Sequence, residues 1–218
     1  MRSNEIEEHK ARLKLTDLQK EVLVGVLLGD ATLETQNGGR TYRMKIEHGG
    51  CQQAYARHLY EIFRQWVLSE PRLKRVTLSN GKTYENIAFS TLSHPALRFY
   101  AHQFYRGGKK VVPRLIKRWL TPKALAYWFM DDGSRKPMES KAVIFNTQCF
   151  ARHEVARLIG VLTEKFHLDA RIRSQKEGYQ IYISGNSFET FSGLVSEHML
   201  PEMKYKIPGA RRTHLHKS

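Results

Sequence analysis

The sequence predicts an α+β fold made of two similar halves, and three features lead to that prediction. Two apolar runs of helical length each end at an aspartate, Asp30 and Asp132, 102 residues apart. Helix-start signals precede both runs, and β-rich stretches then follow each of them in the same order. This period is far longer than the about 20 to 50 residues of a solenoid repeat. The chain is therefore expected to contain two related half-domains.

In the first half, a helix is expected over residues 17–30. Thr16 and Gln19 form a capping-box pattern ahead of it, and the helix is apolar nearly all round, so it is expected to be buried. Gly25 and Gly29 lie four residues apart on one face, a spacing that lets two helix backbones approach closely. Three further elements are expected: strand-like stretches at 42–47 and 83–90, and between them the helical pattern "AYARHLYEIFRQWV".

The second half repeats this order. Thr121 is expected at the N-cap of its first helix, with Pro122 at the first helical position. Strand-like stretches at 142–147 and 179–184 enclose the helical pattern "HEVARLIGVLTEKF". Each half thus reads helix, strand pair, helix, strand pair, helix, with helices packed on one face of an antiparallel sheet. The expected halves are residues 1–118, with a short helical extension over 1–15, and residues 119–218.

Composition narrows the class of partner. The 218 residues include 36 Lys+Arg against 21 Asp+Glu, which gives a formal net charge of +15, and 41% are hydrophobic. A folded protein with a polyanionic partner is expected, with nucleic acid first. No apolar run approaches the ~20 residues of a membrane span, and the N-terminus lacks the apolar region of a secretory signal. Cys51 and Cys149 lack zinc-site spacing, so free thiols in a reducing, intracellular compartment are expected.

The two helix-ending aspartates suggest metal chemistry. A helix C-terminus carries partial negative charge, so a carboxylate there is unfavourable unless a cation is bound. Oxygen ligands without a Cys or His cluster suit Mg²⁺, and paired carboxylates holding divalent metals beside a phosphodiester support hydrolysis. Only Asp132 has a counterpart, Asp30, because Asp131 stands where the first half has Gly29. The alternative is that both are ordinary helix-end residues.

Two motifs carry a family resemblance. "LVGVLLGDA" (23–31) and "LAYWFMDDG" (125–133) resemble the paired motifs of single-chain LAGLIDADG homing endonucleases, as do the lead-in "WLTPK" and the later "FNTQCF". The resemblance implies two αββαββα half-domains with the motif helices at a central interface and the sheets forming a saddle over the DNA major groove. It implies a monomer that makes a metal-dependent staggered break, with 3′ overhangs, in a long non-palindromic double-stranded DNA target.

The resemblance also assigns roles to residues. The catalytic acids fall on Asp30 and Asp132, and the backbone carbonyls of Gly29 and Asp131 are expected to help bind two or three Mg²⁺ ions, with Mn²⁺ as a substitute. One departure is Tyr127, which stands where a small residue is usual. It leaves the register of the second helix open, with Ala126 as an alternative for the close approach.

The remaining site residues are basic or polar. A lysine near each scissile phosphate is placed in "GGKKVVP" (107–113) and "EMKYKIP" (202–208). Lys110 and Lys206 are the first choices, with Lys109 and Lys204 as alternatives. The matched strand-end residues Glu47 and Asn146 are expected to support the metals or the water through the ligands. The histidines, including His48 and His94, are expected to touch phosphates or lie on the surface.

A two-stranded β-ribbon fits the major groove, where outward side chains at every second position can read base edges. The candidates that meet this pattern in the two halves are Arg40, Arg43, Lys45, Lys82, Tyr84, Lys141, Arg171, Arg173, Lys176 and Gln180. Tyr42 is an alternative to Arg43 among these DNA-contacting candidates.

Three alternatives remain open. The first is an intron maturase that binds intron RNA on the same fold, and the second is a non-catalytic DNA-binding regulator, which would be expected to lack one motif acid. The third, a basic ribosome-associated protein, explains the charge but not the repeat. By resemblance to organellar members of the family, a mitochondrial or chloroplast location is expected.

Overall fold

A computed structural model describes residues 3–77, 81–136 and 140–209 of the chain. Contacts divide the chain into two compact units. The first unit holds the residues up to Lys20 together with Asp30–His102, and the second holds Glu21–Gly29 together with the residues from Gln103 onward. The first motif helix therefore begins in one unit and packs in the other. The half boundary between residues 118 and 119 stays a prediction.

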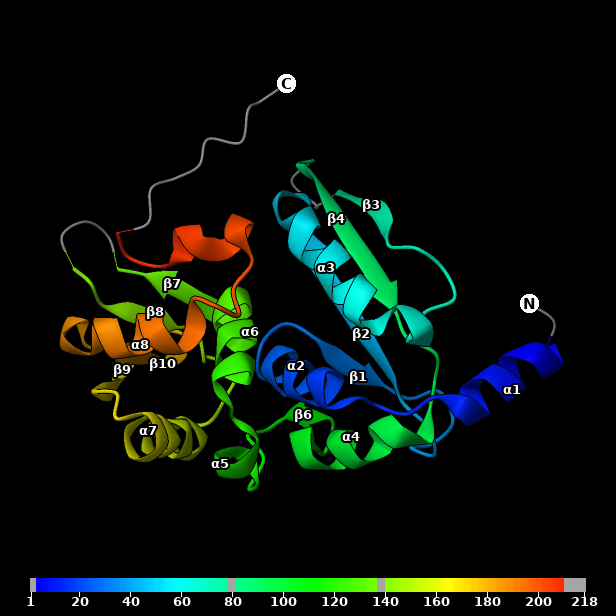
Figure 1. Cartoon of the computed structure of the whole chain (residues 1–218), viewed down its shortest axis with the longest axis horizontal. Coiled ribbons are helices and arrows are strands. Elements are labelled where there is room, and N and C mark those ends of the chain that lie inside the picture. The colour runs from blue at the N-terminus through cyan, green and yellow to red at the C-terminus, as the bar shows by residue number, and fades with distance from the viewer. Residues whose placement is uncertain (1–2, 78–80, 137–139, 210–218) are drawn as a thin grey trace. The chain divides into compact units, whose positions relative to one another are not determined.

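The first unit is built on a four-stranded antiparallel sheet (Figure 1). In sheet order its strands are β1 (Thr32–Glu34), β2 (Arg43–Gly49), β4 (Thr83–Ser90) and β3 (Arg72–Thr77). Helix α3 (Gln53–Phe63) packs on β2 and β4. The other helical segments of this unit are α1 (Ser3–Arg12), η1 (Gly50–Gln52), η2 (Arg64–Trp66), η3 (Pro95–Leu97) and the start of α4 (Arg98–Phe104).

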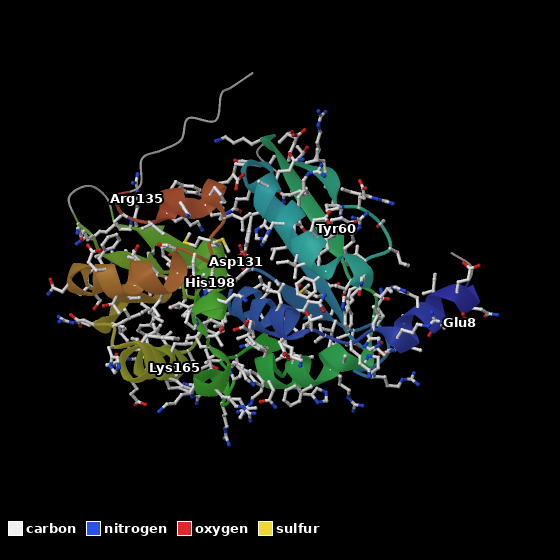
Figure 2. All side chains as sticks on the ribbon, viewed as in Figure 1. Glu8, Tyr60, Asp131, Arg135, Lys165 and His198 are labelled. Atoms are coloured by element: carbon white, nitrogen blue, oxygen red, sulfur yellow. The ribbon has the colours of Figure 1, made fainter. Side chains whose placement is uncertain are left out.

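The sheet of the first unit has one covered face and one outward face. Along β2, Met44, Ile46 and His48 are buried and the residues between them are partly exposed. Tyr60 lies on α3 (Figure 2). Its ring lies against that of Phe89 on β4, with centroids 5.9 Å apart. Since strand side chains alternate between faces, the remaining β2 residues point away from α3.

The second unit repeats this plan. Its sheet runs β7 (Gly133–Arg135), β8 (Val143–Phe145), β10 (Gly178–Ile183) and β9 (Ala170–Gln175), again antiparallel throughout. The helical segments are most of α2 (Asp17–Leu28), α5 (Ile116–Trp119), α6 (Pro122–Asp132), α7 (Arg152–Phe166), η4 (Gly185–Ser187), α8 (Phe188–Val195) and η5 (Pro201–Lys206). A short hairpin, β5 (Tyr105–Arg106) with β6 (Lys109–Lys110), follows α4.

Three buried phenylalanines join helices and sheet in the second unit. The ring of Phe145 on β8 lies 5.4 Å from that of Phe129 on α6 and 6.1 Å from that of Phe191 on α8. Each buried ring contributes about 1.5–3 kcal/mol through apolar burial, and each ring pair about 0.5–1.5 kcal/mol more. Helix α7 packs on β9 and β10, so one face of this sheet is covered as well.

The order of elements confirms the predicted fold class. Each half contains helix, two strands, helix, two strands and helix, and both sheets place the third and fourth strands in the same swapped order. The helix starts are also confirmed, because Thr16 and Gln19 bond each other reciprocally and the Thr121 hydroxyl accepts from Ala124 N at 3.1 Å. Helix α2 ends at Leu28, two residues earlier than expected, and Gly29 and Asp30 form a turn. Within the described ranges, no helix has the length and apolar character needed to cross a membrane.

Candidate functional site

The two motif helices meet at Gly25 of α2 and at Gly29, which directly follows that helix. A Cβ atom on Gly25 would lie 2.5 Å from the carbonyl oxygen of Ala124 and 2.7 Å from Cβ of Tyr127. One turn on, a Cβ on Gly29 would overlap Cβ and Oδ2 of Asp131. Only a residue without a side chain allows these approaches. Tyr127, rather than Ala126, therefore occupies the close approach opposite Gly25, which settles the register left open by the sequence.

The two adjacent acids at the end of α6, Asp131 and Asp132, have different surroundings. Asp131 is buried, with 8% of its surface exposed, and its side chain lies against Gly29. Asp132 is half-buried, and its carbonyl oxygen accepts from the backbone N of Asn146 at 3.0 Å and from its Nδ2 at 2.9 Å. Gly133 follows because a Cβ there would overlap the carbonyl oxygen of Phe129.

Each motif-helix end receives a lysine. Lys110 Nζ donates to the carbonyl oxygen of Gly29 at 2.6 Å. Lys206, 8% exposed, donates to the carbonyl oxygen of Asp131 at 2.9 Å and also to that of Met130. These carbonyls lack helical partners and carry partial negative charge, which favours a cation. The two carbonyls hold the same motif position, so the two lysines make equivalent contacts.

The alternative lysines lie elsewhere. Lys109 is exposed on the β5–β6 hairpin and Lys204 is exposed on η5. Of the two lysines in each stretch, Lys110 and Lys206 are the ones for which the structure gives a contact with a motif-helix end.

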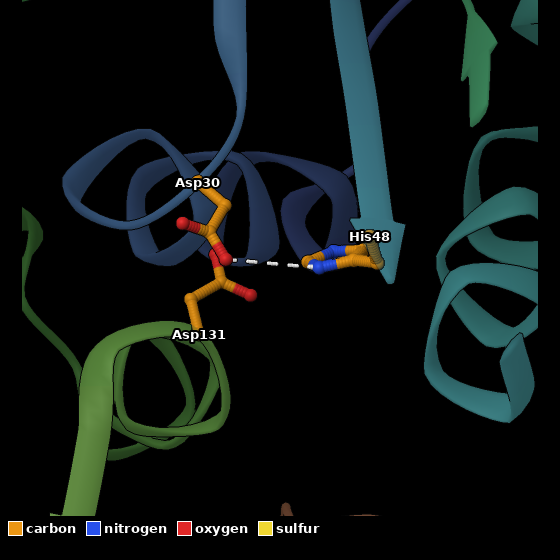
Figure 3. Close-up of side chains that lie close together, drawn as sticks. All are labelled: Asp30, His48 and Asp131. Atoms are coloured by element: carbon orange, nitrogen blue, oxygen red, sulfur yellow. Dashed lines mark ion pairs between the residues drawn. The ribbon is translucent and has the colours of Figure 1, made fainter. Parts of the chain in front are cut away.

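Asp30 lies beside a histidine in the first unit. Its Oδ2 is 3.7 Å from Nδ1 of His48, which comes from β2 (Figure 3). His48 is 4% exposed, and its ring packs 5.0 Å from that of Tyr55 on α3. The expectation that His48 lies on the surface or touches phosphate is wrong, because it continues the inward alternation of Met44 and Ile46. That alternation was the signal in the sequence that could have placed it.

His94 also differs from expectation. Its Nδ1 accepts from Ala96 N at 3.0 Å as the N-cap of η3, and its Nε2 lies 3.0 Å from the carbonyl oxygen of Lys10. Burial lowers the pKa of its ring below the usual value. His94 therefore ties α1 to the first unit as a structural residue.

Glu47 and Asn146 hold matching places, but the expectation that both lie at strand ends is wrong for Glu47, because β2 continues to Gly49, whereas Asn146 directly follows β8. Ile46 and Phe145 occupy equivalent rungs of the two sheets, and Glu47 and Asn146 follow them. Glu47 accepts from Nδ2 of Asn86 at 3.0 Å, and this bond is the main cause that lowers the pKa of its carboxyl; Lys45 adds to the shift. Asn146 instead supports the carbonyl of Asp132.

The outward face of the first sheet carries several of the predicted basic residues. Arg43, Lys45 and Tyr84 lie on it, whereas Arg40 and Lys82 are exposed residues outside its strands. Arg72 and Lys74 of β3 pair with Ala88 and Asn86 and share this face. Sequence reasoning missed them because β3 had not been located.

On the second sheet, Arg171, Arg173 and Gln180 share the outward face, since Arg173 pairs directly with Gln180. An open pocket of about 370 Å³ lies over part of this face, and its lining adds Tyr182 and Lys136, which sequence reasoning missed, to Arg171, Arg173 and Ile172.

Two other predicted basic residues of this half lie apart from that face. Lys176 is exposed in the β9–β10 turn. Lys141 binds Glu189 at 2.8 Å and lies over the ring of Phe188, so α8 holds it on the helical side of the sheet.

Comparison with known proteins identifies the family. A sequence model described as the LAGLIDADG DNA endonuclease family matches residues 20–191, which include both motifs. The chain belongs to this family.

Individual relatives span most of the chain. A probable intron-encoded endonuclease of Wickerhamomyces canadensis is 32% identical over 198 residues, covering 88% of this chain and 85% of that protein. The cytochrome b mRNA maturase bI2 of Debaryomyces hansenii is 30% identical over 192 residues, covering 86% of this chain and 72% of that protein. The homing endonuclease I-WcaI, solved bound to its DNA recognition sequence, matches with a TM-score of 0.89 and 31% identity over 94% of this chain and 92% of that one.

The LAGLIDADG helix ends offer a donor set that suits a divalent metal. The carboxylates of Asp30 and Asp132 follow directly on the helix-end carbonyl groups of Gly29 and Asp131. Carboxylate and carbonyl oxygens are the ligands that hard cations prefer, and the partial negative charge of a helix end favours them further. The residues present therefore fit a metal of this class.

Proposed function

We propose that this LAGLIDADG protein is a homing endonuclease that makes a staggered double-strand break, with 3′ overhangs, in a long DNA target. The observation that carries the proposal is the repeated arrangement at the two motif-helix ends. Each end has an acid, Asp30 or Asp132, next to a carbonyl group that accepts a lysine. Two such ends in one chain provide one hydrolytic site for each DNA strand.

Each site uses the same kinds of groups. Asp30 and Asp132, with the carbonyls of Gly29 and Asp131, would hold two or three divalent ions, with Mg²⁺ as the first choice and Mn²⁺ as a substitute. The bound metal would activate water and offset the charge of the leaving oxygen. Lys110 and Lys206 each bond the carbonyl of the residue that precedes a motif acid in the chain. In the proposed site, each ammonium group would orient the water or stabilise negative charge on the phosphate.

Recognition would come from the outward sheet faces. Their arginine, lysine, tyrosine and glutamine side chains suit base edges and phosphates. Because the two faces carry different residues, the target is expected to be non-palindromic, and a single chain is expected to be sufficient. Arg171 is held in a forked contact by Asp169 at 3.0 Å, which presents its guanidinium in one orientation.

The test uses a plasmid that carries the intronless form of the host gene. Wild-type protein is expected to cut it once on both strands with Mg²⁺ and to bind without cutting in a chelator. Asp30→Asn and Asp132→Asn are each expected to retain binding and to lose cleavage of one strand or both.

Asp17→Asn is the matched control, because Asp17 is an exposed carboxylate at the other end of α2. It should cut like the wild type. Binding without cleavage by the wild-type protein in both Mg²⁺ and Mn²⁺ would overturn the proposal.

A second function, intron RNA maturation, is favoured by the similarity to the cytochrome b mRNA maturase. A mitochondrial or chloroplast location is part of the proposal, by resemblance to organellar members of the family. A splicing assay with the intron transcript separates the activities. Splicing that persists in Asp132→Asn would show that maturation does not need the acid, and no stimulation of splicing would remove this second function.

A further inference from the structure

Helix α7 holds the chain two residues after Lys110. Glu154, 7% exposed in the first turn of α7, accepts from the backbone N of Val112 at 3.0 Å through Oε1 and from that of Ala151 at 2.9 Å through Oε2. Arg157, three residues on, donates from Nη1 to the carbonyl oxygen of Val112 at 2.9 Å. Both backbone polar groups of Val112 are therefore bonded to side chains of one helix. We call this arrangement the Val112 clamp.

The Ala151 bond alone would account for a helix-capping glutamate. In a capping box, the acid in the first turn returns to the N-cap backbone N–H, which here belongs to Ala151. The second carboxylate oxygen of Glu154 instead bonds a residue 42 positions earlier in the chain. A buried carboxylate must have its oxygen atoms satisfied, so this bond is costly to lose.

The hairpin that carries Lys110 is short. Strand β6 is two residues long and pairs only with β5, and the turn between them contains the exposed Gly107 and Gly108. Isolated two-stranded hairpins are marginally stable. After the hairpin, Val111 N bonds the carbonyl oxygen of Phe104 at 2.7 Å, and the Val112 clamp comes next. The clamp thus fixes the backbone from which Lys110 reaches Gly29.

We propose that Glu154 and Arg157 are positioning residues for Lys110, and through it for the active site that Lys110 serves. The inference rests on the proposed catalytic role of Lys110. Lys206 lies on a different element, η5, so loss of the clamp should weaken one active site and leave the other intact. Loss of the clamp is therefore expected to slow cleavage of one DNA strand and not of the other.

The experiment follows both strands of one target duplex, each carrying its own 5′ fluorophore, with the full chain and Mg²⁺. Lys110→Met and Lys206→Met first assign each strand to its lysine. Arg157→Met is then expected to slow cleavage of the DNA strand assigned to Lys110 by about 10- to 100-fold, because a small misplacement of a catalytic group lowers the rate by about that much. The other strand should keep its wild-type rate, so nicked duplex accumulates.

Arg157→Lys should restore much of the lost rate, because its ammonium can still donate to Val112. Glu154→Gln should show the same strand bias, because the amide nitrogen that replaces one carboxylate oxygen cannot accept a hydrogen bond from a backbone N–H. The matched control is Glu164→Gln, which removes an exposed α7 carboxylate bonded to Lys117 and should leave both strands unchanged. An equal slowing of both strands, or no change, in Arg157→Met and Glu154→Gln would overturn the proposal.

Amide hydrogen exchange tests the clamp without cleavage. Val112 is expected to exchange faster in Glu154→Gln than in the wild type, while the thermal transition of the protein stays cooperative. Unchanged protection of Val112 would overturn the inference. If Lys110→Met instead leaves both strands at wild-type rates, the proposed role of Lys110 fails, and the positioning role of Glu154 and Arg157 fails with it.

Discussion

The side chain of Lys206 carries an ammonium group that is buried at the C-terminal end of α6. Burying a charge is costly unless it is compensated, and the carbonyl groups of Met130 and Asp131 supply that compensation. They belong to the last turn of α6, where partial negative charge collects. The same contact that makes burial tolerable also fixes the ammonium at the carbonyl of Asp131, the residue before Asp132 in the chain.

Replacing Lys206 with methionine keeps most of the side-chain stem and removes the charge. Cleavage of its assigned strand is expected to fall by about 100- to 1000-fold, the usual cost of losing a group that stabilises developing charge. The free energy of unfolding should fall by about 1–3 kcal/mol because helix-end carbonyls lose a buried donor. Strand-resolved cleavage and urea unfolding measure the two effects.

Lys204→Met is the control for that change, since Lys204 is exposed two residues away on η5. If Lys204→Met reduced cleavage as much as Lys206→Met does, general positive charge would support cleavage, rather than the contact of Lys206 with the helix end.

The hydrogen bond between Glu47 and Asn86 should make the stability of the protein depend on pH. Its carboxyl pKa is lowered mainly by the Asn86 bond and next by Lys45. A carboxyl with a lowered folded-state pKa stabilises the protein above its unfolded-state pKa and loses that effect as pH falls through the folded-state value. Asn86→Ala is therefore expected to raise the Glu47 pKa and to destabilise the protein at neutral pH but not in strong acid.

NMR titration of the Glu47 side chain measures the pKa, and urea unfolding at neutral and acidic pH measures stability. Lys45→Met should raise the pKa by less than Asn86→Ala does. The reverse order would contradict the assignment of the Asn86 bond as the main cause.

At the scale of elements, the contact between α2 and α6 is unequal. Helix α2 supplies Gly25 and the turn after it supplies Gly29, and α6 supplies Tyr127 and Asp131 opposite them. The missing side chains of one helix make room for the large side chains of the other. Close packing of this kind is sensitive to single methyl groups, because the interior has few voids.

Gly25→Ala is expected to destabilise the protein by about 1–3 kcal/mol, the range for forcing an extra methyl into a packed core. The new Cβ would press on a backbone oxygen of Ala124, which cannot move aside as a flexible side chain could. Thermal unfolding measures the change.

Gly160→Ala is the matched control on α7, where an added Cβ meets nothing within 4 Å. It should be neutral or stabilise by about 0.5–1 kcal/mol, because alanine is the better helix former. If Gly160→Ala lowered the stability as much as Gly25→Ala does, the effect would come from the helix backbone rather than from the α2–α6 contact.

Elements and motifs were predictable from sequence because they depend on local signals. Periodicity, the caps at Thr16 and Thr121, and the spacing of Gly25 and Gly29 are all visible in a window of a few residues. The choice between adjacent lysines was not, because it depends on which Nζ reaches a helix end far away in the chain. The Val112 clamp was hidden for the same reason, since it joins residues 42 positions apart.

For the molecule as a whole, the formal net charge of +15 is spread over the chain and includes both outward sheet faces. If six to ten phosphates are neutralised, affinity for DNA should fall by about 10³- to 10⁵-fold between about 50 and 200 mM salt. Lys74→Met on the outward face of β3 is expected to reduce the slope of log affinity against log salt by about one.

Lys117→Met is the control for the salt measurement. Lys117 is an exposed lysine of α5, bonded to Glu164, and lies outside both sheets. Its removal should leave the slope unchanged. Equal slope changes for the two variants would mean that total charge, rather than the sheet face, sets DNA binding.

The unequal glycine content of the motif helices has a consequence for engineering the chain. Two copies of the second motif would place Tyr127 opposite Tyr127, where this chain has Tyr127 opposite Gly25. Two copies of the first motif would place glycine opposite glycine, which allows the helices to approach closely. A homodimer for palindromic sites is therefore better built from two first motifs, and a design with two second motifs would need a small residue in place of Tyr127 before its DNA-facing residues are changed.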